Sequence, residues 1–166
     1  MAARITIRVA KNEELSQIKG LSVDELPDEL NEYERPHAEE AKKVFARRLD
    51  QLLQKGGNEF FVAEVDGAQG IAGYVWFGIS ERPFSDMKVG WIYDLLVVPT
   101  QRGKGVGEAL LRHALGVSKK RGFELSGLMV RANNNVAYSL YEKLDFKPEY
   151  VLMTRKESGA QSASNS

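Results

Sequence analysis

Apolar residues follow two different periods in the first third of the chain. Residues 5–9 alternate apolar and polar side chains, which predicts a half-buried strand. Residues 12–21 and 41–53 repeat apolar residues every three or four positions, which predicts two amphipathic helices. Asn12 can cap the first helix, and the Gly-Gly pair at 56–57 ends the second. The chain therefore begins with a strand and two helices.

Three strand-like segments follow these helices. Residues 60–65 and 71–79 are joined through an Asp-Gly pair at 66–67, a pattern typical of a hairpin. Residues 90–98 are almost continuously apolar, which is typical of a strand buried on both faces. This third segment is expected near the centre of the sheet.

The remaining sequence alternates helices and strands. In chain order, the predicted elements are a helix over 109–117, a strand over 125–130, a helix over 133–144 and one or two short strands over 146–155. The full order, β-α-α-β-β-β-α-β-α-β, predicts an α/β (α+β) fold in which helices flank a mixed central β-sheet. We expect a single domain over residues 1–156. The small, polar tail over 157–166 is expected to be disordered.

The composition limits the chemistry available to the chain. Its 166 residues include no cysteine, which excludes disulfides, thiolate metal sites and an acyl-cysteine intermediate. The formal net charge of +0 argues against general nucleic-acid binding. No apolar run approaches the roughly 18 residues of a membrane helix, and the first residues lack the apolar stretch of a signal peptide. We therefore expect a cytoplasmic protein without a metal, nucleic-acid or membrane partner.

The charges are distributed unevenly along the chain. Residues 24–40, the acidic segment, carry eight carboxylates against the single basic residue Arg35. Residues 101–131 carry seven basic residues against two carboxylates. The first segment suits a cation and the second suits an anion.

A glycine-rich loop follows the apolar strand and leads directly into a helix. Gly103, Gly105 and Gly107 alternate with other residues, so the backbone can approach a ligand closely. The start of the next helix offers N–H groups to a phosphate. The spacing fits neither the Walker loop, since Lys104 precedes Gly105, nor the dinucleotide motif, since Glu108 stands where its third glycine would be. A simple turn remains the alternative for this loop.

Two sequence blocks together resemble the GNAT superfamily of N-acetyltransferases. The first block is Arg102-x-x-Gly105-x-Gly107, which matches the coenzyme A loop of that family. The second block lies in the predicted helix over 133–144 and just beyond it, and its matching residues are Asn134, Ala137, Leu140, Tyr141 and Phe146. Asp145 departs from the pattern, because the family usually has glycine there. The resemblance implies the GNAT fold and acetyl-CoA as co-substrate.

The resemblance also implies which residues hold acetyl-CoA. The strand would pair its backbone with the pantetheine arm, the loop would surround the pyrophosphate, and the last helix would reach the arm and the sulfur. The implied residues are Leu95, Leu96, Val97, Arg102, Gly103, Lys104, Gly105, Val106, Gly107, Glu108, Asn134 and Tyr141. The base that meets the 3′-phosphate stays open.

Tyr141 and Asp94 are the predicted catalytic residues. The resemblance makes Tyr141 the general acid. Asn134 and Tyr141 are two helical turns apart, about 10.5 Å, so they share one face of the helix. Met129 stands where some family members have a glutamate base, which leaves Asp94, in the central strand, as the best carboxylate, with Glu81 and Glu34 as outside candidates. The alternatives are that Tyr141 is a core residue and Asp94 a structural one.

The predicted reaction moves an acetyl group from acetyl-CoA to a primary amine by direct attack in a ternary complex. The acidic segment favours a polyamine or a basic peptide as acceptor. Three alternatives stay open: a protein N-terminal or lysine acetyltransferase, an acyl-CoA-binding sensor without catalysis, and a nucleotide-binding oxidoreductase. A homodimer is also an open prediction.

Overall fold

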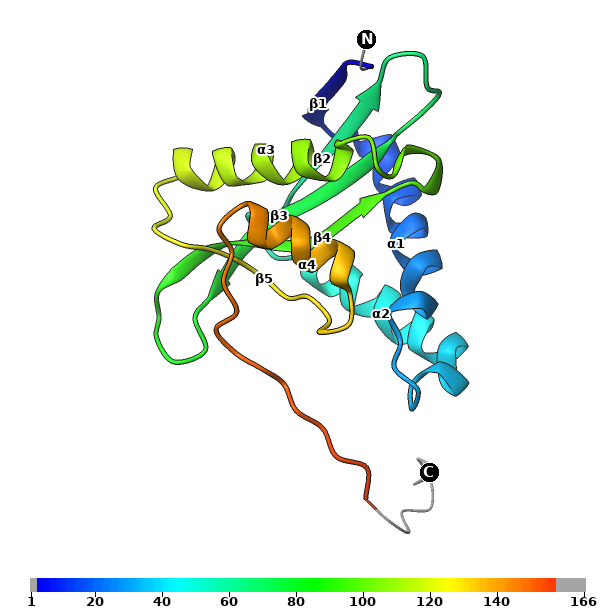
Figure 1. The fold of residues 1–166 in the computed structure, drawn as a ribbon, viewed down its shortest axis with the longest axis vertical. Helices are drawn as coiled ribbons and strands as arrows, with labels where there is room; N and C mark the ends of the chain where they lie inside the picture. Colours follow the sequence, from blue (N-terminus) through cyan, green and yellow to red (C-terminus); the bar gives the residue numbers. More distant parts are fainter. Residues whose placement is uncertain (1–2, 158–166) are drawn as a thin grey trace.

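Five strands lie side by side in one mixed sheet, in the order β1-β2-β3-β4-β5 (Figure 1). The computed structural model describes residues 3–157. The first four strands pair antiparallel, and β5 pairs parallel with β4. The bounds are β1 Ile5–Val9, β2 Glu59–Val65, β3 Gly73–Glu81, β4 Lys88–Val97 and β5 Ser126–Leu128. The predicted mixed α/β sheet with flanking helices is confirmed.

Helices cover both faces of this sheet (Figure 1). The helices are α1 Leu15–Glu29, α2 Ala38–Leu53, α3 Val106–Lys120 and α4 Asn135–Lys143, with short 3-10 helices at Asn12–Glu14, Arg35–His37 and Pro99–Gln101. The first helix was predicted over 12–21, but α1 continues through Pro27 to Glu29. The lost N–H of this proline falls in the last turn of α1, where one missing hydrogen bond disturbs little of the helix.

The strand β3 divides its side chains between two apolar cores. Val75 and Phe77 pack with Leu110 of α3 on one face of the sheet. Tyr74 packs with Ile18 of α1 on the other face. Because successive side chains of a strand point to opposite faces, a strand covered on both sides reads as a continuous apolar run.

The strands β4 and β5 pair only over a short distance and then separate. Their register ends at the pair formed by Ile92 and Leu128, although β4 continues to Val97. The chain leaves β5 after Leu128 and reaches α4 through a loop over 129–134. As a result, the end of β4 has one edge that no strand of the described residues occupies, and α4 lies beside it (Figure 1).

The strand predicted over 146–155 is absent, and this prediction is wrong. Residues 147–157 form neither helix nor strand and run away from the body of the protein (Figure 1). Its first part is held by an ion pair of 2.5 Å between Arg82 and Glu149 and by an edge contact between Phe84 and Tyr150. Near its end, Lys156 Nζ lies over the ring of Tyr33, 5.5 Å from the ring centroid. A β-prone sequence becomes a strand only against a free strand edge, and β5 offers just three residues.

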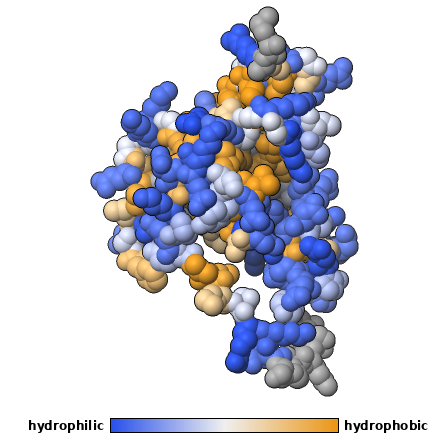
Figure 2. Space-filling view, viewed as in Figure 1, coloured by the Kyte–Doolittle hydropathy of each residue, from blue (hydrophilic) through white to orange (hydrophobic). Residues whose placement is uncertain are grey.

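The surface of this segment carries apolar side chains. Figure 2 shows them between the body of the protein and the polar end of the chain. The exposed residues are Val151, Leu152 and Met153. Residues 158–166, which make up almost all of the tail predicted to be disordered, lie outside the described residues. The domain limits of 1–156 stay a prediction.

Within residues 3–157, every helix is too short or too polar to cross a membrane.

Candidate active site

The open edge of β4 includes the strand residues that were predicted to bind the cofactor. Leu95 and Val97 pack toward the core beneath α3, and Leu96 packs toward the core beneath α1. Their backbone on the other edge of β4 has no strand partner among residues 3–157. An extended ligand can therefore add to this edge with backbone hydrogen bonds, as an additional strand would.

The glycine loop takes a shape that requires glycine at two positions. Gly103 has a φ of 75° and Gly105 a φ of 83°. These are left-handed conformations, which cost other residues about 1–2 kcal/mol. A Cβ atom at either position would meet nothing within 4 Å, so the outer surface of the loop is open. Glycine is therefore favoured at these two positions by the backbone conformation of the loop, and not by a lack of space for a side chain.

The start of α3 has no side-chain cap among residues 3–157. Gly105 is the N-cap residue, and no side chain in this part of the chain accepts a cap hydrogen bond from the first turn. The first N–H groups of a helix have no partner inside it, and they carry the positive end of the helix dipole. The open loop and this helix start together form a surface suited to a phosphate.

The basic side chains of the loop contact the protein itself. Arg102 donates from Nε to the carbonyl oxygen of Val97 at 3.0 Å and from Nη2 to Glu25 Oε2 at 3.0 Å. Lys104 Nζ donates to Gln101 Oε1 at 3.1 Å. In this structure, Arg102 ties the loop to β4 and α1. The predicted contacts of Arg102 and Lys104 with a pyrophosphate stay a prediction.

Glu108 connects α3 with α4. Its carboxylate accepts from Lys143 Nζ at 2.5 Å and from Arg112 Nε at 2.9 Å. Lys143 first, and Arg112 second, lower the pKa of the Glu108 carboxyl through these hydrogen bonds. The ion pair fixes the position of α4 relative to the glycine loop, so Glu108 supports the site with its side chain.

Tyr141 lies half-buried on α4 and packs against the core beneath α3. Its ring meets Phe146 edge-on, with 5.9 Å between the ring centroids. Burial raises the pKa of Tyr141 to about 12, and the negative charges of Asp94 and Glu29 add to this shift. The hydroxyl is therefore protonated at neutral pH and can serve as a proton donor.

Asn134 begins α4 and caps it. Its Oδ1 accepts from the Ala137 backbone N–H at 3.1 Å. This is a structural use of the side chain that the sequence reasoning did not anticipate, although asparagine at a helix start is a common cap. The expected contact of Asn134 with the cofactor arm stays a prediction.

Asp94 is held by two buried hydroxyl groups. Its Oδ2 accepts from Ser22 Oγ and from Tyr74 Oη, each at 2.6 Å. Burial, and then the charge of Asp94, raise the pKa of Tyr74, so this hydroxyl stays a donor. The structural interpretation of Asp94 gains support from these contacts. Since Ser22 is 72 residues away in sequence, no local signal could have found it.

A small cavity of about 20 Å³ lies beside Asp94. Ser22 and Tyr74 also line it, together with apolar side chains of the core beneath α1. A cavity needs roughly 10–15 Å³ to hold one water molecule. The carboxylate of Asp94 therefore has room for a single water, which a proton relay would need.

The other predicted bases lie elsewhere. Glu81 is exposed at the end of β3. Glu34 accepts from the Asn31 backbone N–H at 3.2 Å in the connection between α1 and α2. Glu29, whose charge acts on Tyr141, was anticipated only as a member of the acidic segment. Because the acidic segment contains eight carboxylates, the sequence alone could not distinguish Glu29 from the others.

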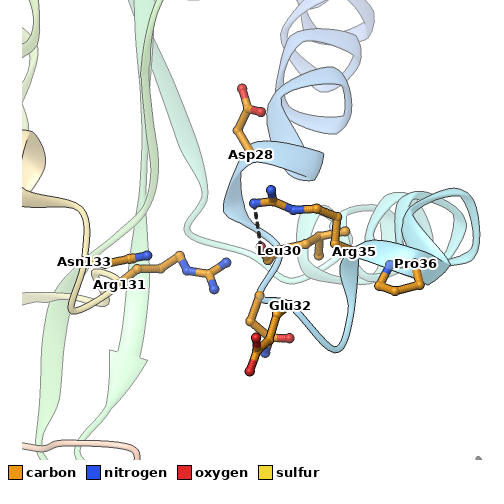
Figure 3. A pocket seen from close by; sticks show the side chains of 8 residues that line it. Asp28, Leu30, Glu32, Arg35, Pro36, Arg131 and Asn133 are labelled. Carbon is orange, nitrogen blue, oxygen red and sulfur yellow. Dashed lines mark hydrogen bonds between the residues drawn. The ribbon is translucent and has the colours of Figure 1, made fainter.

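A cavity of about 560 Å³ lies between the α1–α2 connection and the loop after β5 (Figure 3). It is lined by Asp28, Leu30, Asn31, Glu32, Arg35, Pro36, Arg131 and Asn133. The acidic segment therefore does line a cavity, with Asp28 and Glu32. The sequence reasoning missed Arg131, which points from the other side toward Glu32 and Leu30 (Figure 3).

The order of strands, the separation of β4 and β5, and the glycine loop before α3 are the features of the acetyltransferase fold class. The sequence model of the Acetyltransferase (GNAT) family matches residues 21–146. The chain belongs to this family. The resemblance inferred from the loop and from the Asn134–Phe146 block is thus confirmed.

Relatives of known sequence or structure agree with this membership. The chain is 28% identical over 146 residues to an uncharacterized N-acetyltransferase of Methanocaldococcus jannaschii, covering 81% of this chain and 62% of the relative. It is 39% identical over 107 residues to a mycothiol acetyltransferase of Salinispora tropica, covering 64% of this chain and 34% of the relative. The chain thus spans less than two thirds of each of these relatives.

A solved structure shows the same architecture. This is a proposed acetyl transferase from Pyrococcus furiosus, which superposes with a TM-score of 0.76 and 29% sequence identity. The match covers 93% of this chain and 100% of the other.

Proposed function

We propose that the chain transfers an acetyl group from acetyl-CoA to a primary amine, by direct attack of the amine in a ternary complex. The observation that carries this proposal is the open edge of β4, which runs from the glycine loop past the position of Tyr141. The family membership supports acetyl-CoA as the co-substrate. Because the chain has no cysteine, a transfer through an acyl-cysteine is excluded.

Two parts of the chain would bind acetyl-CoA: the backbone edge of β4, and the glycine loop with the start of α3. The edge of β4 over 95–97 can hold the pantetheine arm through backbone hydrogen bonds. The loop over 102–108 and the first turn of α3 can hold the pyrophosphate through N–H groups. A backbone N–H of β4 near Val97 would also stabilise the oxyanion that forms when the amine attacks the thioester carbon.

Tyr141 and Asp94 would move the two protons of the reaction. As the carbon–sulfur bond breaks, the sulfur leaves with the electron pair and takes the proton of the Tyr141 hydroxyl. The attacking nitrogen loses a proton, and Asp94 accepts it through one water. Both residues are restored when Asp94 releases its proton to solvent and Tyr141 regains a proton from solvent. The protonated state of Tyr141 at neutral pH supports this assignment.

The acceptor class follows from the acidic segment. Asp28 and Glu32 line the cavity, which supports a cationic acceptor such as a polyamine or a basic peptide. A protein N-terminal or lysine acetyltransferase is compatible with such a cationic acceptor. The alternative to an enzyme is an acyl-CoA-binding sensor without catalysis. The cytoplasmic location and the homodimer stay predictions.

Binding of acetyl-CoA is tested by thermal unfolding. At 100 times its dissociation constant, a ligand adds about 2.7 kcal/mol of stability, which raises the Tm of a chain of this size by about 5–10 °C. Gly105→Val should abolish most of this rise, because the side chain would stand in the open surface of the loop. Gly67→Val is the matched control, since Gly67 also has a positive φ, of 80°, and open space around it, but lies in the β2–β3 turn.

Two results would contradict the proposal in different ways. An unchanged Tm of the unmodified protein in millimolar acetyl-CoA would remove acetyl-CoA as ligand. A normal rise in Tm without coenzyme A release from any amine would favour the sensor. Equal loss of the rise in both glycine variants would show that strain alone, and not the loop surface, is responsible.

A further inference from the structure

The cavity between the α1–α2 connection and the loop after β5 holds four charged groups that do not pair with one another. Asp28 and Glu32 supply the carboxylates, and Arg35 and Arg131 the guanidinium groups. Among the ion pairs of residues 3–157, none joins any two of these four side chains. Among the described residues, the Arg35 side chain donates only to the carbonyl oxygen of Leu30, at 3.3 Å (Figure 3).

Elsewhere in the chain, neighbouring opposite charges come together. Arg8 binds Glu14 at 2.7 Å, and Arg112 binds Glu108 at 2.9 Å. The Arg131 side chain, in contrast, donates no hydrogen bond to another described residue and points across the cavity (Figure 3). Only the backbone carbonyl oxygen of Arg131 accepts one, from the Asn134 N–H at 3.0 Å. The cavity instead keeps both signs available for a ligand.

We propose that this cavity binds an acceptor that carries a carboxylate as well as its amine, with Arg131 and Arg35 holding the carboxylate and Asp28 and Glu32 facing the ammonium charge. The inference rests on the proposed acetyltransferase function and narrows its acceptor. Of the two proposed acceptor classes, polyamines and basic peptides, the inference favours peptides and also admits amino acids. A polyamine has no carboxylate that the two arginines could bind.

The charges of the cavity also argue for a carboxylate over a phosphate. Two guanidinium groups and two carboxylates sum to a net charge of zero. A zwitterion of one ammonium and one carboxylate leaves this balance unchanged. A phosphate carries roughly −1.5 to −2 charges at pH 7 and would face Asp28 and Glu32 as well as the arginines. Arginine also binds the two oxygens of a carboxylate in a planar, paired geometry.

Two segments that line the cavity also lead toward the proposed centre of reaction. Asp28 and Leu30 flank Glu29, whose charge acts on the Tyr141 hydroxyl. Asn133 lines the cavity and precedes Asn134, the cap of α4. A ligand held by Arg131 can therefore extend its amine toward the open edge of β4, beside α4. The cavity volume of about 560 Å³ leaves space for an amino acid or the end of a peptide.

The test compares acceptors that differ only in the carboxylate. Arginine and agmatine share a guanidinium group and a single reactive amine, and only arginine has the carboxylate. Lysine with cadaverine, and a short basic peptide as its C-terminal acid or amide, are the second and third pairs. Coenzyme A release gives kcat/KM for each acceptor at saturating acetyl-CoA. The three pairs separate a free amino acid from a peptide end as the source of the carboxylate.

The variant Arg131→Gln should lower kcat/KM for the carboxylate-bearing member of the preferred pair by about 10- to 100-fold, the range for a lost hydrogen bond to a charged group. It should change kcat/KM for the carboxylate-free member by less than about threefold. Arg48→Gln is the matched control, because it removes the same charge from an exposed position on α2. The rise in Tm caused by acetyl-CoA should be the same in all three proteins.

Each result has one meaning. A higher kcat/KM for agmatine, cadaverine and the peptide amide than for their acids would overturn the inference and leave the acetyltransferase proposal intact. Equal losses for both members of a pair in Arg131→Gln would also overturn it. Release of no coenzyme A with any acceptor would contradict the proposed function itself, and the acceptor inference with it.

Discussion

Asp94 provides the sharpest test of the site, because its structural and catalytic roles predict different results. The substitution Asp94→Ala removes the acceptor of two hydroxyl donors, Ser22 and Tyr74, whose residues are 8% and 0% exposed. A buried polar group left without a partner costs about 1–3 kcal/mol. Asp94→Ala should therefore lower the free energy of unfolding by about 2–6 kcal/mol.

A graded set of variants checks this magnitude. Asp94→Asn keeps an oxygen acceptor in place and removes the charge, so it should cost less than Asp94→Ala. Ser22→Ala removes one donor and leaves Tyr74 bound to Asp94, so it should cost about 1 kcal/mol. Urea unfolding at pH 7, followed by far-UV circular dichroism, gives the three values. An Asp94→Ala protein as stable as Ser22→Ala would refute the role of the two hydrogen bonds.

The same variants separate the catalytic role from the structural one. If Asp94 accepts the proton of the amine, Asp94→Asn should lower the rate by a larger factor at low pH than at high pH, because the amine is mostly protonated at low pH. Ser22→Ala should keep a pH profile of the same shape as the unmodified protein, because the carboxylate stays in place. A constant ratio of Asp94→Asn to unmodified rates across pH would remove Asp94 as the base.

The remaining predictions concern a proton donor and an acid-sensitive ion pair. Tyr141→Phe should lower kcat about 100-fold or more while leaving the affinity for acetyl-CoA nearly unchanged, because the ring keeps its contact with Phe146; an unchanged kcat would assign Tyr141 to packing. Hydrogen bonds from Arg8 and from the Lys11 backbone lower the pKa of Glu14 from 4.5 to about 2, so its stabilising contribution is complete above pH 4.5 and is lost as pH falls toward 2. Unfolding free energies measured over this range should therefore fall less steeply in Glu14→Gln, and parallel pH curves would show that Glu14 contributes nothing.

Local sequence determined the parts of this protein that depend on neighbouring residues. Alternating apolar residues placed β1, because side chains two apart in a strand share a face. The hairpin pattern placed β2 and β3, and a continuous apolar run placed β4. The glycine loop was also readable, since Gly103 and Gly105 adopt backbone angles that other residues avoid. Asp145 shows the same logic, because its φ of 65° lies where the family has glycine and where aspartate is tolerated.

Tertiary structure alone decided which distant groups meet. Asp94 joins Ser22 and Tyr74 across 72 and 20 residues, so its environment could not be read from β4. Arg131 belongs to a basic stretch in the sequence, yet it faces the acidic segment across a cavity. The segment over 146–155 has the composition of a strand and forms none, because a strand needs the backbone of a partner, and no pattern within the segment supplies one.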